Sequence, residues 1–137
     1  MKLNRLIYLA SPYTHPDLDV MEFRYEEACR ALAQLSQLGI SIYAPIPHTH
    51  PMTRYIPLQS HDFWMRFDLP LLLSCDEVWV LMLDGWEQSK GVMAELEVAR
   101  KHRIPISFVS PGSDIMVPEV RVRPDGPARF ATALVPC

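Results

Sequence analysis

Apolar runs of strand length alternate along the chain with helix-length segments whose apolar residues recur every three or four positions. The strand-like runs are "LIYLA" at Leu6–Ala10, "ISIY" at 40–43, "EVWVLML" at 77–83 and "IPISFV" at 104–109. Strands separated by helices of this length must cross over and run parallel within one sheet. The pattern predicts an α/β fold: a three-layer sandwich with a flavodoxin-like parallel sheet of four to five strands.

Helix signals fill the gaps between these runs. The first helix is expected from an Asp19 cap to about Leu38, and the second over about 60–74. Pro70 lies inside the second helix and should kink it or divide it into two pieces. The third helix should begin at Ser89, because a serine hydroxyl is a good N-cap.

The end of the chain has a weaker pattern. "EVRVR" at 119–123 alternates like a fifth, edge strand, but recurring prolines predict an irregular tail over 111–137. A length of 137 residues suits one domain with a real core and is too short for two comfortable ones. We therefore expect a single domain over 1–137.

Open parallel sheets bind ligands beyond the carboxyl ends of their strands, in the crevice where the strand order reverses. This rule selects three connections: 11–17 after the first strand, a stiff, Pro-rich loop at 45–52, and 84–89 after the third strand. We expect the functional residues there.

Composition narrows the class of protein. The chain is 49% hydrophobic and 21% charged, which is ordinary for a soluble globular protein, and its net charge of -3 offers no footprint for nucleic acid or anionic lipid. Its three cysteines are widely separated and form no disulfide framework or CxxC pair. No signal peptide and no apolar run of about eighteen residues is present. These features predict a cytoplasmic protein without a nucleic-acid or membrane partner.

The start of the third helix is the first candidate binding site. A cap at Ser89 leaves backbone N–H groups near Gly91 pointing outward at the positive end of the helix dipole, where a phosphate could bind. Gly91 would let the anion approach the backbone closely. A capped helix with nothing bound explains the same residues.

Carboxylates form the second candidate. Glu95 lies on a flank of the third helix beside its apolar stripe, so it should project toward the crevice, whereas Glu97 should be solvated. Asp68 sits in the most hydrophobic stretch and must either pair locally or serve a site. Asp84 ends the third strand near the crevice, although Asp-Gly is equally a turn signature. Glu95 with Asp68 or Asp84 would suit glycosidic chemistry, in which one carboxylate attacks the anomeric carbon and another carboxyl moves protons.

Histidines and tryptophans leave alternatives open. His48 and His50 could share one side of a strand end and bind a metal, but no third ligand has a recognised spacing, so we predict no metal and no cofactor. These rings could instead line a pocket. Trp79 should be a core residue, whereas Trp86 could stack on a base or close the pocket.

Three stretches together resemble the nucleoside 2-deoxyribosyltransferase superfamily, which includes nucleoside 5′-monophosphate N-glycosidases. They are "IYLASPYT", "GISIYAPIPH" and "FDLPLLLSCDEVWVLMLDGWEQSKGVMAELEVA", and the resemblance covers roughly the first 110 residues. Its most specific element is S-x-G-x-x-x-E, following an apolar strand that ends in a D-x-W-type loop.

The resemblance implies a role for individual residues. Glu95 would be the nucleophile that attacks C1′ and forms a glycosyl-enzyme ester, and Asp68 would help to protonate the leaving base. Tyr8 would hold the glutamate in place. Ser89 and the adjacent amides would bind a 5′-phosphate, while Ser11 and the following loop would line the sugar side. A homo-oligomer is implied by the same analogy.

The resulting hypothesis is an enzyme that cleaves or exchanges the N-glycosidic bond of a nucleoside or nucleoside 5′-monophosphate, with hydrolysis preferred over transfer because Ser89 offers a place for phosphate. Its partner would be that small molecule. One alternative is a non-catalytic nucleotide-binding or sensing module, and a weaker one is a metal-dependent hydrolase using His48 and His50.

Overall fold

The computed structural model of the chain describes residues 5–119, which form a sheet of four parallel strands. The sheet has the order β2-β1-β3-β4, with β1 at Leu6–Ala10, β2 at Ser41–Tyr43, β3 at Glu77–Leu81 and β4 at Ile106–Val109. The chain leaves β1 for β2, returns across β1 to β3, and continues to β4, so the strand order reverses between β1 and β3. This confirms the predicted flavodoxin-like α/β sandwich.

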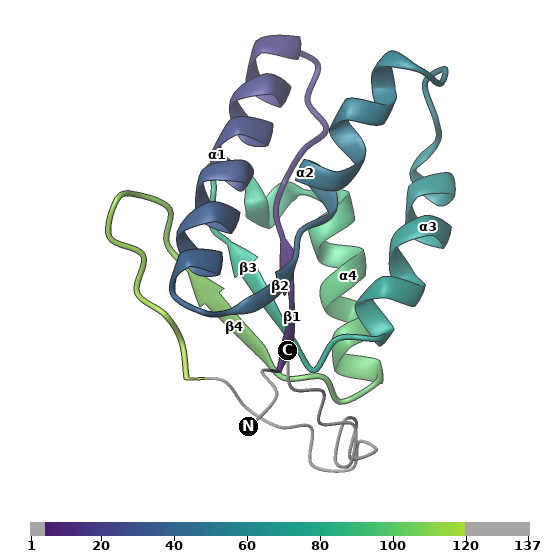
Figure 1. Cartoon of the computed structure of the whole chain (residues 1–137). Helices are drawn as coiled ribbons and strands as arrows, with labels where there is room; N and C mark the ends of the chain where they lie inside the picture. The colour runs from purple at the N-terminus through teal and green to yellow at the C-terminus, as the bar shows by residue number, and fades with distance from the viewer. Residues whose placement is uncertain (1–4, 120–137) are drawn as a thin grey trace.

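Helices cover both faces of this sheet (Figure 1). The helix α1 (Leu18–Gln37) packs on one face, and α3 (His61–Leu73) and α4 (Lys90–Lys101) pack on the other. Short helical segments complete the connections: α2 at Pro45–Thr49, and the 3-10 turns η1 at His50–Arg54 and η2 at Trp86–Gln88. No helix within residues 5–119 is long and apolar enough to span a bilayer.

The core is divided by the sheet into two layers, because successive strand residues point to opposite faces. Tyr8 and Val80 face α3 and α4, whereas Ile7 and Trp79 face α1. Every residue of β3 is buried, as expected for a strand covered on both sides. Trp79 is fully buried, which confirms its prediction as a core residue.

Two helix predictions need correction. The cap of α1 is Asp17, whose extended backbone lets its carboxylate accept a hydrogen bond from the Asp19 N–H at 2.9 Å, so Asp19 already lies inside the first turn. Of the two outcomes expected at Pro70, the division of the helix is wrong, since α3 runs without a break to Leu73 and Pro70 lies in its last turn. The Ser60 and Ser89 hydroxyls cap α3 and α4, accepting hydrogen bonds from the backbone N–H groups three residues on.

The segment predicted as a stiff loop at 45–52 is helical. Pro45 occupies the first position of α2, where no helical N–H bond is lost, and the Thr49 hydroxyl donates to the Pro45 carbonyl at 2.9 Å. In the tail, residues 111–119 form no helix or strand. The strand predicted over 119–123 lies outside the described residues except for Glu119, which is not in a strand.

Candidate active site

The side chain of Glu95 is held inside the molecule by the packing of α4. Val92, Leu96 and Ala99 are buried against the sheet, and Glu95 lies beside them with only 6% of its surface exposed. The Tyr8 hydroxyl, from the middle of β1, donates a hydrogen bond to Glu95 Oε2. The expectation that this glutamate points inward is therefore met by the geometry, and Glu97 is exposed as expected.

Asp68 brings a second carboxyl group to the same region from α3. Its side chain is 9% exposed, and its Oδ1 atom is buried with no hydrogen-bond partner among residues 5–119. The charge of Asp68 acts on both Glu95 and Tyr8, raising the pKa of each. Groups from β1, α3 and α4 thus form one buried cluster, which we call the carboxylate cluster: Tyr8, Asp68 and Glu95.

Burial dominates the protonation of this cluster. It raises the pKa of Glu95 to about 8; the hydrogen bond from Tyr8 opposes this rise, and the charge of Asp68 adds to it. Burial also raises the pKa of Asp68 to about 6, and raises the pKa of Tyr8 well above its usual value. Asp68 ionises first, so Glu95 titrates in the presence of an existing negative charge.

This order of titration has a chemical consequence. Between about pH 6 and about pH 8 the two carboxyl groups share one proton. One group can then donate a proton while the other is an ionised carboxylate. Because the pKa of Glu95 is the higher of the two, most of this proton is on Glu95 and Asp68 is mostly ionised.

An aromatic group adjoins the cluster on the β2 side. The Tyr43 hydroxyl hydrogen-bonds His48 Nδ1 at 2.8 Å, and the Tyr43 ring centroid lies 5.8 Å from that of Tyr8. The exposed His48 ring lies 5.8 Å from the Phe67 ring. His48 is therefore linked to the carboxylate cluster through Tyr43. Sequence reasoning missed Tyr43, although the stretch G-x-x-x-Y-x-P that contains it was visible.

His50 points elsewhere. Its Nδ1 lies 2.6 Å from the Tyr13 hydroxyl, its Nε2 lies 3.0 Å from Glu22 Oε2, and its ring stacks on Tyr25 with centroids 4.0 Å apart. The expectation that His48 and His50 share one side is wrong, because residues two apart on a helix diverge by about 200°. No group of three or more His, Cys, Asp or Glu side chains able to hold a metal exists within residues 5–119.

The connection after β3 forms a turn. β3 ends at Leu81 rather than at the predicted residue 83, and Asp84 is exposed in a turn closed by the Trp86 N–H donating to the Leu83 carbonyl. Asp84 therefore shows the turn geometry of an Asp-Gly pair. Trp86 is half-buried and packs on Phe108 of β4, with centroids 5.4 Å apart.

Two of the predicted binding residues lie where the chain leaves β1 and where it enters α4. Ser11 follows β1 directly and is buried. The cap at Ser89 is confirmed, since its hydroxyl accepts a hydrogen bond from the Val92 N–H at 3.2 Å. A Cβ atom built at Gly91 would meet only Ser89 Oγ, at 3.9 Å, so the folded chain itself does not require glycine there.

Arg24 is a second residue that sequence reasoning missed. It lies on the buried face of α1 with Ala28, Ala31 and Leu35, and is only 8% exposed. Its guanidinium reaches the connections after β1 and β3. The available signal in the sequence was the spacing of Arg24, which places it on the same face of the helix as the apolar residues.

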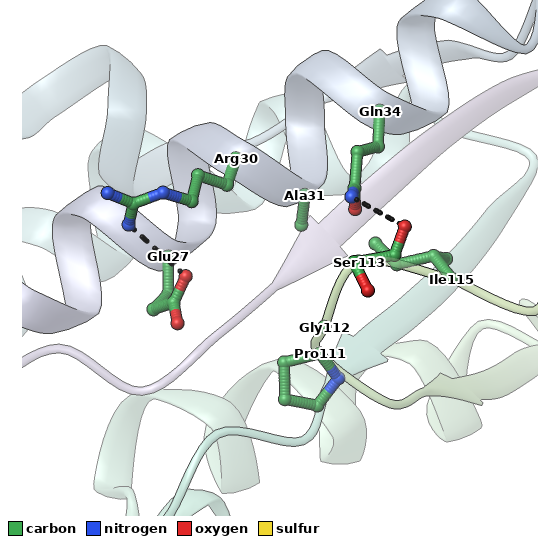
Figure 2. Close-up of a pocket in the computed structure, with 8 residues that line it drawn as sticks. All are labelled: Glu27, Arg30, Ala31, Gln34, Pro111, Gly112, Ser113 and Ile115. Atoms are coloured by element: carbon green, nitrogen blue, oxygen red, sulfur yellow. Dashed lines mark hydrogen bonds and ion pairs between the residues drawn. The ribbon is translucent and has the colours of Figure 1, made fainter.

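A separate cavity of about 340 Å³ lies between α1 and the segment after β4 (Figure 2). There the Gln34 amide donates to the Ser113 carbonyl at 3.1 Å, and Arg30 pairs with Glu27 at 3.4 Å. This cavity is on the α1 side of the sheet, whereas Glu95 lies on the α3–α4 side. It is therefore distinct from the carboxylate cluster.

The arrangement of strands and helices is an α/β fold of the 2-deoxyribosyltransferase type. The structure is similar to that of a 2-deoxyribosyltransferase from the psychrotolerant bacterium Bacillus psychrosaccharolyticus, with 23% identity and a TM-score of 0.57, over 82% of this chain and 77% of that one. Residues 5–111 match the family described as a domain of unknown function (DUF1937), and the chain belongs to this family. No curated protein matches it. The resemblance inferred from sequence is thus confirmed for the fold.

Proposed function

We propose that this protein cleaves the N-glycosidic bond of a nucleoside or nucleoside 5′-monophosphate, or transfers its sugar to a second base. The observation that carries the proposal is the buried Glu95, hydrogen-bonded by Tyr8 and close enough to Asp68 for the two carboxyls to be coupled. The similar fold of a 2-deoxyribosyltransferase supports this class of substrate.

In the proposed reaction, ionised Glu95 attacks C1′ of the sugar. The C1′–N bond breaks, its electron pair goes to the base nitrogen, and protonated Asp68 supplies the proton to that base. Because Tyr8 engages Oε2, the second oxygen of Glu95 is the one available for attack. Water, deprotonated by Asp68, or a second base then attacks C1′ and releases the glutamate.

The phosphate site is proposed at the start of α4. Ser89 and the amides near Gly91 lie at the positive end of a twelve-residue helix, where an anion is stabilised. Ser11 and His48 would line the sugar, and Trp86 the base. This assignment favours hydrolysis of a 5′-monophosphate over base exchange.

One observation favours a second candidate, a nucleotide-binding module without turnover. A Glu95 pKa of about 8 keeps most of this carboxyl protonated at neutral pH, and a protonated carboxyl is not a nucleophile. An enzyme would then work through the minor form in which Glu95 is ionised and Asp68 is protonated.

The test is base release from a panel of nucleosides and 5′-monophosphates, followed by chromatography. We expect free base with the native protein, none with Glu95→Gln, and undiminished release with Glu97→Gln, which alters an exposed carboxylate on the same helix. Circular dichroism checks that both variants fold. Adding a second base separates transfer, which yields a new nucleoside, from hydrolysis, which yields free sugar.

Other outcomes decide between the alternatives. Binding of nucleotides without base release by the native protein would identify the binding module. Loss of activity on chelation, reproduced by His48→Ala, would instead support a metal-dependent hydrolase. If the native protein neither binds nucleotides nor releases any base, the proposal is overturned.

A further inference from the structure

Arg24 connects the two loops that flank the point where the strand order reverses. Its Nη1 donates hydrogen bonds to the carbonyls of Thr14 at 3.0 Å and Tyr13 at 3.4 Å, in the loop after β1. Its Nη2 donates to the Asp84 carbonyl at 3.0 Å, in the loop after β3. A single guanidinium therefore bridges Thr14 and Asp84, which are 70 positions apart in the sequence.

The positively charged guanidinium of Arg24 forms its hydrogen bonds with backbone carbonyl groups. Among residues 5–119, no carboxylate lies within ion-pair distance of it. Burial lowers the pKa of the guanidinium, and the charge of Asp84 opposes that effect, but an arginine stays protonated. Charge-assisted hydrogen bonds in a buried setting are strong and directional, so these carbonyls are held at fixed positions.

The backbone at Gly85 is adapted to this contact. A Cβ atom at Gly85 would lie 2.6 Å from Arg24 Nη2, closer than real side chains approach. Gly85 also has a φ of +88°, a conformation that favours glycine. A side chain at position 85 would therefore require the Arg24 guanidinium to shift from its place against this loop.

The loop after β1 is fastened on a second side as well. The Tyr13 hydroxyl lies 2.6 Å from His50 Nδ1, and His50 in turn meets Glu22 of α1. The loop after β1 is thus attached through its carbonyls to Arg24, and through the Tyr13 side chain to the first residue of η1. Arg24 links this loop to the loop after β3.

We propose that Arg24 is a positioning residue that sets the spacing between the loop beginning at Ser11 and the loop ending at Ser89. This inference rests on the proposed function, in which the first loop contacts the sugar and the second the phosphate. Glu95, Asp68 and Tyr8 come from α4, α3 and β1, so they keep their places when the loops shift. Replacing Arg24 should therefore weaken substrate binding more than it slows the chemical step.

The test compares Arg24→Met and Arg24→Lys with Arg30→Met, which removes an exposed arginine from the same helix. We expect Arg24→Met to lower kcat/KM for a 5′-monophosphate by about tenfold to a hundredfold, chiefly through KM. Arg24→Lys should recover part of this loss, because one ammonium can reach one loop but not hold both. Arg30→Met should behave as the native protein.

Hydrogen exchange tests the bridge without depending on activity. In Arg24→Met, amides in 11–17 and 84–89 should exchange faster, while those in the middle of α4 keep their protection. If the native protein releases no base, faster exchange would still support the bridge while the proposed function fails. Unchanged exchange in both loops would overturn the inference, and so would a loss confined to kcat. If Arg24→Met does not fold, the kinetics and the hydrogen exchange are both measured on Arg24→Lys instead.

A double-mutant comparison tests the contact itself. Gly85→Ala should speed exchange in 84–89 strongly in the native background and less in the Arg24→Met background, where the guanidinium is gone. Equal effects in the two backgrounds would contradict the inference, because the strain would then come from the backbone of Gly85 alone.

Discussion

Replacing Glu95 with glutamine should make the protein more stable at alkaline pH. Glutamine has the shape of a protonated glutamate, and its amide oxygen can still accept the hydrogen bond from Tyr8. The substitution therefore removes the ionisation of a side chain that is only 6% exposed and changes little else. It isolates the free-energy cost of the buried charge.

The sign and size of this change in stability follow from the pKa of Glu95. Burial raises the pKa of Glu95 from 4.5 to about 8, so the folded state holds this proton more tightly than the unfolded state does. The resulting stabilisation is complete below about pH 4.5 and is lost as the pH rises through about 8. At about 1.4 kcal/mol per pKa unit the full loss is about 5 kcal/mol. Structural relaxation and water around the charge reduce it, so we expect about 2–5 kcal/mol.

Urea unfolding of the native protein and of Glu95→Gln, followed by circular dichroism from about pH 5 to about pH 9, measures this quantity. The difference in free energy of unfolding should be small at about pH 5 and should grow toward about pH 9 in favour of the variant. Glu97→Gln, which changes an exposed carboxylate two residues away, should show no such growth. A difference for Glu95→Gln that stays constant with pH would refute the assignment of a raised pKa to Glu95.

Three further predictions concern the proposed reaction. The pH profile of kcat/KM should be bell-shaped with limbs near pH 6 and pH 8, because activity needs one proton shared by Asp68 and Glu95; a plateau extending well above pH 8 would contradict this. Tyr8→Phe removes a hydrogen bond that lowers the Glu95 pKa, so steady-state kinetics should show the alkaline limb moving to higher pH and the maximum falling; an unmoved limb would count against the contact. Gly91→Ala should leave thermal stability unchanged or raise it by up to about 1 kcal/mol, while titration calorimetry finds weaker binding of a 5′-monophosphate but not of the nucleoside. Equal losses for both ligands would argue against a phosphate at Ser89.

Sequence patterning was sufficient for most of the architecture. The alternation of strand-like and helical segments predicted the parallel sheet, and the bounds of β1 match the expected Leu6–Ala10. The inward position of Glu95 followed from its place beside the buried stripe of α4. These predictions succeed because they depend on local periodicity, which the side chains themselves carry.

Other features depend on contacts that periodicity does not encode. Pro45 and Pro47 indicated a loop, yet prolines in the first turn of a helix lose no hydrogen bond, so α2 forms and separates His48 from His50. The bridge made by Arg24 was invisible because its acceptors are backbone carbonyls, which every residue type carries. Coupling between Asp68 and Glu95 likewise requires α3 and α4 to pack side by side.

The central claim is that Glu95 forms a covalent bond to the anomeric carbon. Incubation with a 2′-fluoro-substituted nucleoside or 5′-monophosphate, which slows breakdown of a glycosyl-enzyme ester, followed by intact-mass measurement and peptide mapping, tests it directly. The account predicts one sugar adduct per chain, located on Glu95 and absent from Glu95→Gln. An adduct on another residue, or base release that persists in Glu95→Gln, would contradict it.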